Sequence, residues 1–170
     1  MFLSVFPCST ASLLFALVIG IDEYYDSRVK NLSGAVADAE DVETFLIETM
    51  NVSPSRITKL HNREATRENI KECIRGLATH PDIKKGDPIL IFYAGHGSEA
   101  VPPRGWPAGG PNKKIQMLVP YDFIPSTVLS ERGQGIPDIT LSVLLTRIAK
   151  AKGDNITVIL DCCYSGSGTR

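Results

Sequence analysis

The chain has almost no charge imbalance and no cluster of basic residues. Its 170 residues include 18 Lys and Arg against 19 Asp and Glu, which gives a formal net charge of −1. The longest basic runs are the pairs Lys84-Lys85 and Lys113-Lys114. Nucleic-acid binding depends on a basic patch or stripe, which such pairs do not supply. We therefore expect no nucleic-acid partner and a substrate that is neutral or locally basic.

Cysteine is also scarce. The four cysteines are Cys8, Cys73, Cys162 and Cys163, too few and too irregularly spaced for a disulfide scaffold. A bridge between the adjacent Cys162 and Cys163 would be strained. We expect reduced thiols and therefore a cytoplasmic location.

No apolar run is long enough to cross a membrane. The most apolar stretch, Ser12–Ile21, is well short of the ~20 residues that span a bilayer. No Lys or Arg precedes it and no convincing cleavage site follows, so it does not resemble a secretion signal. We assign residues 15–21 to the first buried strand of a parallel sheet and expect no membrane partner. Residues 1–14 are left as an extension of unknown role, in which a weak targeting signal stays an open alternative, and residues 15–170 form one domain.

Strand-like and helix-like periods alternate along the domain. Further strands are expected at 56–60, 88–94 and 156–160, and helices at 34–50 behind a Ser33 cap, after a Thr66 cap, and around 141–148. The Pro- and Gly-rich residues 100–114 predict a surface loop, followed by a short edge strand at 116–120. This order predicts an α/β fold with a mostly parallel central sheet flanked by helices.

A histidine and a cysteine follow two of these strands. His96, in YAGHGS, comes just after the strand at 88–94, and Cys163, in LDCCYSG, comes just after the strand at 156–160. The carboxyl ends of parallel strands lie along one edge of a sheet, where chemistry collects. Alone, His96 would be a turn residue and Cys163 a buried thiol, but their joint placement predicts a nucleophilic Cys–His dyad.

The expected chemistry gives each group a role. Cys163 would attack a carbonyl carbon as a thiolate, and His96 would carry the proton to the leaving group. Backbone N–H groups near Gly97 and Cys163 are the natural donors to the oxyanion. Cys162 is the competing nucleophile. Because side chains alternate between faces along a strand, only one of the two cysteines should face the cleft.

The order and spacing of several segments resemble one protein family. LVIGIDEY, LSGAVADAEDV, ILIFYAGHGS, IQMLVPYDF, GIPDITL and VILDCCYSGSGTR look like the large-subunit half of the caspase and metacaspase clan of cysteine proteases, and of fungal metacaspase-like proteins in particular. The resemblance implies a three-layer caspase-like sandwich, peptide-bond hydrolysis and the same oxyanion donors. Its Asp-x-Cys pattern selects Cys163 as the nucleophile.

The resemblance also implies a specificity. Asp38 and Asp161 fall where metacaspases line the pocket for an arginine or lysine that precedes the cut bond, and two carboxylates there favour a cationic side chain. Without the resemblance, Asp38 would be a solvated helix charge. Asp161 would tune a neighbouring group or cap a turn.

No cofactor or metal is expected. Asp122 and Asp138 match two of the aspartates of calcium-activated metacaspases, but Ile139 and Arg170 stand at the other positions, and two ligands do not make a calcium site. Asp138 is better explained as a helix cap. A zinc site from Cys162, Cys163 and His96 would lack the usual chelate spacing.

Two other function classes remain open. A catalytically weak or silent caspase-like module would bind protein partners without cleaving them. A nucleotide-binding domain would need a glycine-rich phosphate loop, and the sequence contains neither common form. The family continues with a small-subunit half beyond the position of Arg170. We therefore expect an open sheet edge, self-association and weak or no activity of this chain alone.

Overall fold

The computed structural model describes residues 12–100, 114–125 and 134–162. Its main sheet has four parallel strands in the order β2-β1-β3-β7. The strands are β1 (Phe15–Gly20), β2 (Ile57–His61), β3 (Ile89–Ala94) and β7 (Ile156–Asp161). Each strand lies where the sequence pattern predicts one, to within two residues at either end. The expected α/β fold with a mostly parallel sheet is confirmed.

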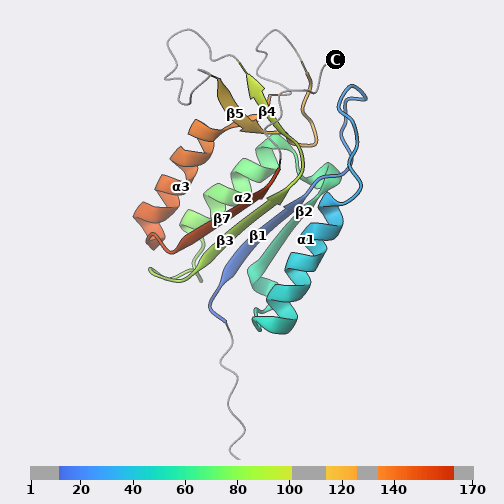
Figure 1. The fold of residues 1–170 in the computed structure, drawn as a ribbon. Coiled ribbons are helices and arrows are strands. Elements are labelled where there is room, and N and C mark those ends of the chain that lie inside the picture. Colours follow the sequence, from blue (N-terminus) through green and yellow to red (C-terminus); the bar gives the residue numbers. More distant parts are fainter. Residues whose placement is uncertain (1–11, 101–113, 126–133, 163–170) are drawn as a thin grey trace, which may run out of the picture.

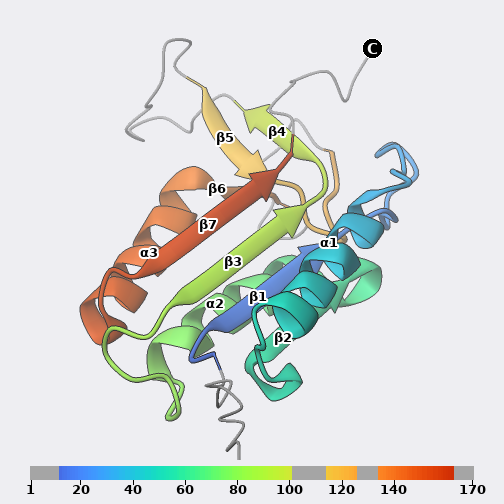
Figure 2. The same ribbon diagram turned by 60° about the horizontal axis from the view of Figure 1, so that its bottom comes forward.

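Helices cover both faces of this sheet. Helix α1 (Ala35–Thr44), continued by a π-helical turn at Phe45–Thr49, packs on one face, and α2 (Arg67–Thr79) and α3 (Asp138–Lys152) pack on the other. Figure 2 shows α1 in front of the strands and the other two helices behind them. The result is a sandwich of three layers with the sheet in the middle.

Strand β1 is buried along its whole length because both of its faces are covered. Leu17 and Ile19 belong to the larger core cluster, which includes apolar side chains of α2 and α3. Ala16 and Val18 belong to a second cluster with residues of α1. The smaller side chains on the α1 side let that helix lie close to the sheet.

Strand β7 pairs only with β3 among the described residues, so it is an edge strand of the main sheet. Its burial alternates along the strand. Val158 and Leu160 pack against the larger core cluster, whereas Ile159 is 45% exposed on the opposite face. The face of β7 on the side of α1 is therefore left open to solvent.

A small antiparallel sheet lies beyond the carboxyl ends of β3 and β7 (Figure 1). It consists of β4 (Gly97–Ala100), β5 (Ile115–Leu118) and β6 (Ile136–Pro137) in the order β4-β5-β6. The prediction of an edge strand at 116–120 was wrong in this respect, because β5 is the central strand of a separate sheet. The sequence did not reveal this because its two partners are only four and two residues long. Most of the Pro- and Gly-rich loop predicted at 100–114 lies outside the described residues.

The two predicted helix caps had different outcomes. Thr66 caps α2 as expected, because its hydroxyl accepts a hydrogen bond from the N–H of Asn69 at 3.3 Å. The Ser33 cap was wrong. The carboxylate of Asp22, in the loop after β1, accepts hydrogen bonds from the first N–H groups of α1, those of Gly34, Ala35 and Val36, at 3.0, 2.9 and 3.2 Å. A carboxylate satisfies several free donors at once and complements the positive end of the helix.

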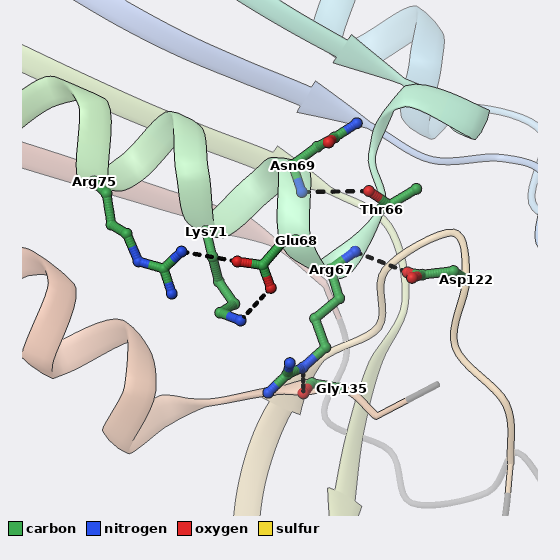
Figure 3. A network of polar contacts seen from close by, with 8 residues as sticks. All are labelled: Thr66, Arg67, Glu68, Asn69, Lys71, Arg75, Asp122 and Gly135. Atoms are coloured by element: carbon green, nitrogen blue, oxygen red, sulfur yellow. Dashed lines mark hydrogen bonds and ion pairs between the residues drawn. The ribbon is translucent and has the colours of Figure 1, made fainter. Parts of the chain in front are cut away.

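Polar contacts at the start of α2 fix the chain segment that follows β5 (Figure 3). Asp122 Oδ1 accepts from the Arg67 N–H at 2.7 Å, and Arg67 Nε donates to the Gly135 carbonyl at 3.2 Å. The N–H of Tyr121 also donates to the Ala65 carbonyl at 2.9 Å. The small sheet is thereby attached to a helix of the main sandwich.

Candidate active site

The carboxyl ends of three parallel strands are joined to one another by backbone hydrogen bonds. The N–H of Ile21, just after β1, donates to the Ala94 carbonyl at 3.0 Å. The N–H of Gly95, just after β3, donates to the carbonyl of Asp161 at the end of β7, at 3.2 Å. The loop after β1, His96 and Cys162 therefore meet at one edge of the sheet, as the topology of parallel strands requires.

His96 lies between β3 and β4 and is partly exposed. Its Nε2 is 2.7 Å from the carbonyl oxygen of Lys30, in the loop between β1 and α1. A carbonyl oxygen can only accept a hydrogen bond, so in the neutral ring Nε2 must carry the proton. Nδ1 is then the basic nitrogen. The Lys30 carbonyl thus selects the tautomer and the ring orientation, as an acidic third group does in other nucleophilic sites.

An aromatic ring lies beside the imidazole. The centroid of the Tyr24 ring is 5.0 Å from that of His96, with an interplanar angle of 36°. Tyr24 is 8% exposed. Burial raises the pKa of its phenol well above the ordinary range, so Tyr24 stays protonated.

The predicted nucleophile Cys163 lies outside the described residues. Cys162, the alternative, is partly buried and packs against the larger core cluster. It follows Leu160 on the same face of β7, the face that packs on α3. The alternation of side chains along the strand supports the view that Cys162 belongs to the core side. The choice of Cys163 remains a prediction.

Asp161 shares a row of the sheet with two small residues. In the strand register Gly20 is paired with Ala94, and Ala94 with Asp161, so the three lie side by side on the α1 face. The first turn of α1 lies directly over Gly20, because a Cβ built there would be 2.7 Å from the Ala35 carbonyl oxygen. Asp38 belongs to that first turn. Asp161 and the helix turn that carries Asp38 thus lie on the same face of the sheet.

Both of these aspartates are exposed, and neither forms an ion pair with another residue in the described part of the chain. Exposed carboxylates that lack a cation can accept one from a ligand. Gly97, a predicted oxyanion donor, is the first residue of β4 and directly follows His96. Its role in binding an oxyanion stays a prediction.

The described residues contain no group of three or more His, Cys, Asp or Glu side chains arranged to hold a metal ion. Asp122 is bonded to the N-terminus of α2. Asp138 is the first residue of α3, where its Oδ1 accepts from the N–H of Ile139 at 2.7 Å, and Pro137 holds the cap position instead. Within the same residues, no helix has the length and apolar character that crossing a bilayer requires.

A family model for the peptidase C14 domain of metacaspases matches residues 15–169. The chain belongs to the metacaspase family. Metacaspase-7 of Arabidopsis thaliana is 27% identical over 156 residues, covering 89% of the chain and 34% of that protein. Metacaspase-1 of Eremothecium gossypii is 27% identical over 158 residues, covering 89% and 32%. Metacaspase-3 of Trypanosoma cruzi is 29% identical over 168 residues, covering 95% and 42%.

The chain therefore spans about a third to two fifths of the length of these curated relatives. Among solved structures, the crystal structure of a protein from Geobacter sulfurreducens matches with a TM-score of 0.65 at 24% identity, covering 91% of this chain and 51% of that one. That likeness supports the fold. The family model that matches the chain is that of a peptidase domain.

Three features of the site were not identified from the sequence. The carbonyl of Lys30, the ring of Tyr24 and the capping carboxylate of Asp22 all come from the loop between β1 and α1. A backbone carbonyl has no signature in a sequence. Tyr24 could be noticed in the sequence only as an aromatic residue just past the end of a buried strand, which does not indicate a role in the site.

Proposed function

We propose that this protein is a cysteine endopeptidase that cleaves peptide bonds after arginine or lysine, with Cys163 as nucleophile and His96 as its proton-transfer partner. The observation that carries the proposal is the position of His96 at the joined carboxyl ends of β1, β3 and β7. Cys163 follows β7 by two residues, so the same sheet edge is within its reach. Membership of a cysteine peptidase family supports this chemistry.

The proposed reaction has two acyl-transfer steps. The Cys163 thiolate attacks the scissile carbonyl carbon, a C–S bond forms, and the C–N bond breaks as the imidazolium of His96 protonates the departing amine. Water then attacks the thioester, His96 Nδ1 removes its proton, and the acid product leaves as the C–S bond breaks. Backbone N–H groups of Gly97 and Cys163 would stabilise the oxyanion in both steps.

The Lys30 carbonyl supports this use of His96. It holds the proton of the neutral ring on Nε2, which leaves Nδ1 free to exchange protons with the thiol. It also accepts a hydrogen bond from the same nitrogen when the ring becomes a cation. No cofactor or calcium ion enters this reaction.

The proposed specificity rests on Asp38 and Asp161. Both belong to the α1 face of the sheet, both are exposed, and neither has a cationic partner among the described residues. A long cationic side chain of the substrate would reach both. Loss of one charged partner from such a site typically costs ~2–5 kcal/mol, which is at least tenfold in specificity.

Turnover of fluorogenic peptides that differ only in Arg, Lys or Asp before the reporter tests the proposal. We expect turnover of the Arg and Lys peptides, its loss in Cys163→Ala and His96→Ala, and its retention in Cys162→Ala. Asp38→Asn should reduce cleavage of the Arg peptide about tenfold or more. Asp41→Asn, which removes the same charge from an exposed position on the same helix, is the matched control.

Preference for the Asp peptide would contradict the assigned pocket, and loss of turnover in Cys162→Ala alone would move the nucleophile to Cys162. Absence of turnover in the wild-type chain, together with no reactive thiolate at Cys163, would favour a catalytically silent protein-interaction module instead.

We further propose that two copies of the chain associate through the edge of β7. Among the described residues no strand pairs with the outer edge of β7, which carries the exposed Ile159 side chain, and an unpaired strand is a template for pairing with a second one. Size-exclusion chromatography with light scattering should give a mass above one chain, and Ile159→Lys should return it to the monomer. A monomeric wild-type chain at high protein concentration would refute the association.

A further inference from the structure

Two phenol hydroxyls contact the backbone of His96, one at each end of the residue. The N–H of His96 donates to Tyr24 Oη at 2.8 Å. Tyr93 Oη lies 2.8 Å from the His96 carbonyl oxygen and 2.9 Å from the Val119 carbonyl oxygen, and it can donate its one proton to either of them. The N–H of Val119 donates to the same His96 carbonyl at 3.0 Å. Both backbone groups of His96 are therefore held.

The two tyrosines lie where movement is restricted. Tyr93 is fully buried in β3, and Tyr24 is 8% exposed and also donates to the Ile21 carbonyl at 3.3 Å. The two hydroxyls thus connect the backbone at the end of β1, the His96 peptide and the residue after β5.

Gly95 makes this arrangement possible. A Cβ at Gly95 would be 2.9 Å from Tyr93 Oη and 3.2 Å from Tyr24 Oη, so the backbone before His96 passes directly over the two hydroxyls. Contacts this close leave no space for any side chain larger than hydrogen at that position. The requirement for glycine in YAGHGS follows from the two phenols.

The side chain of His96 is held by the same loop that provides Tyr24. Its Nε2 is bonded to the Lys30 carbonyl, and its ring rests beside the ring of Tyr24. An apolar core would be filled equally well by phenylalanine at both tyrosine positions. The hydroxyls are therefore best explained by what they bond, which is the peptide of His96.

We infer that Tyr24 and Tyr93 are positioning residues for His96. Their hydroxyls fix its backbone, so that the imidazole stays on the Lys30 carbonyl and presents Nδ1 to the nucleophile. The catalytic meaning of this inference rests on the proposed peptidase function, whereas the positioning itself can be measured without any substrate.

The kinetic test uses Tyr24→Phe and Tyr93→Phe, which keep the rings and remove only the hydroxyls. We expect kcat to fall about tenfold or more with little change in KM, because a small displacement of a reacting group is costly while the substrate pocket is untouched. Tyr25→Phe is the matched control, since that neighbouring ring is 70% exposed and contacts Tyr121 rather than His96. Unchanged kcat in both hydroxyl variants would overturn the inference.

The second test reads the imidazole directly. The chain has three histidines, so ¹⁵N shifts of the His96 ring can be assigned with His61→Gln and His80→Gln. We expect the wild-type ring to be in the Nε2–H form and both hydroxyl variants to show a mixture of tautomers. A purely packing role for the tyrosines would leave the tautomer unchanged.

The two tests separate the inference from the proposed function. If the wild-type chain does not cleave peptides, the peptidase proposal fails while the ring spectra still decide the positioning. If the hydroxyl variants do not fold, the wild-type spectrum alone decides, because a mixed or Nδ1–H ring would contradict the contacts that the inference uses.

Discussion

The close packing of α1 on the sheet makes Gly20→Ala the most informative single substitution for the architecture of the site. A Cβ at position 20 would lie 2.7 Å from the Ala35 carbonyl oxygen, 2.8 Å from the Ala39 Cβ and 2.9 Å from the Val36 Cα. None of these atoms belongs to a flexible side chain. The methyl group can be accommodated only if α1 moves away from β1.

The size of this movement follows from the contact distances. Favourable carbon–carbon separations are about 3.5–4.0 Å, so a contact of 2.8 Å requires α1 to move by about 0.7 Å or more. Overpacking of this kind typically costs about 1–3 kcal/mol. The first turn of α1 carries Asp38, so the shift should also weaken the preference for arginine and lysine.

Urea unfolding of Gly20→Ala and Gly76→Ala tests this reasoning with the same chemical change at two sites. A Cβ at Gly76, inside α2, has nothing within 4 Å, and alanine is the better helix former by about 0.5–1 kcal/mol. We expect Gly76→Ala to be more stable than the wild type and Gly20→Ala to be less stable. Equal stability of Gly20→Ala and the wild type would refute the close packing of α1 on β1.

Three further predictions concern the cap of α1, the ion pairs of α2 and calcium. Asp22→Ala should lower the free energy of unfolding by about 0.5–2 kcal/mol in urea titrations, because the carboxylate accepts hydrogen bonds from three helix N–H groups. Asp22→Asn should lower it by less. An unchanged free energy of unfolding in Asp22→Ala would exclude Asp22 as the cap. The hydrogen bonds from Lys71 and then Arg75 lower the pKa of Glu68 from 4.5 to about 2. The ionised Glu68 therefore stabilises the folded chain fully above pH 4.5, and this stabilisation is lost as the pH falls toward 2. Glu68→Gln should therefore lose less stability than the wild type between pH 5 and pH 2, and identical losses would contradict the effect. Calcium or a chelator should leave peptide turnover unchanged, and activation by calcium would mean that Asp122 and Asp138 have ligands from elsewhere.

Much of the main sheet could be predicted from the sequence because its strands are continuous apolar runs. Strands such as β1 and β3 are buried on both faces, so nearly every residue in them is apolar. Their carboxyl ends must lie together in a parallel sheet, and the position of His96 followed from that rule. The order of the strands in space did not follow, since it depends on which helix covers which face.

The unpredicted parts have physical reasons of their own. Strands β4 and β6 are too short to show a period, and β4 begins with a glycine. The cap of α1 comes from Asp22, twelve residues before Gly34, whereas Ser33 is next to the helix in sequence and was the better local candidate. The contact of His96 with Lys30 uses a backbone carbonyl, which every residue has.

The central claim is that the thiol of Cys163 attacks a carbonyl placed by an arginine in the neighbouring pocket. A peptide that ends in an arginine acyloxymethyl ketone tests it directly, because the attacking thiolate displaces the carboxylate and leaves a stable C–S bond. Mass spectrometry of the digested protein should show one modified residue, Cys163. Labelling should be much slower in the His96→Ala variant, and much slower in the wild type when the probe carries aspartate in place of arginine. Modification of Cys162 or Cys73 instead, or equal labelling by both probes, would contradict the assigned nucleophile and its pocket.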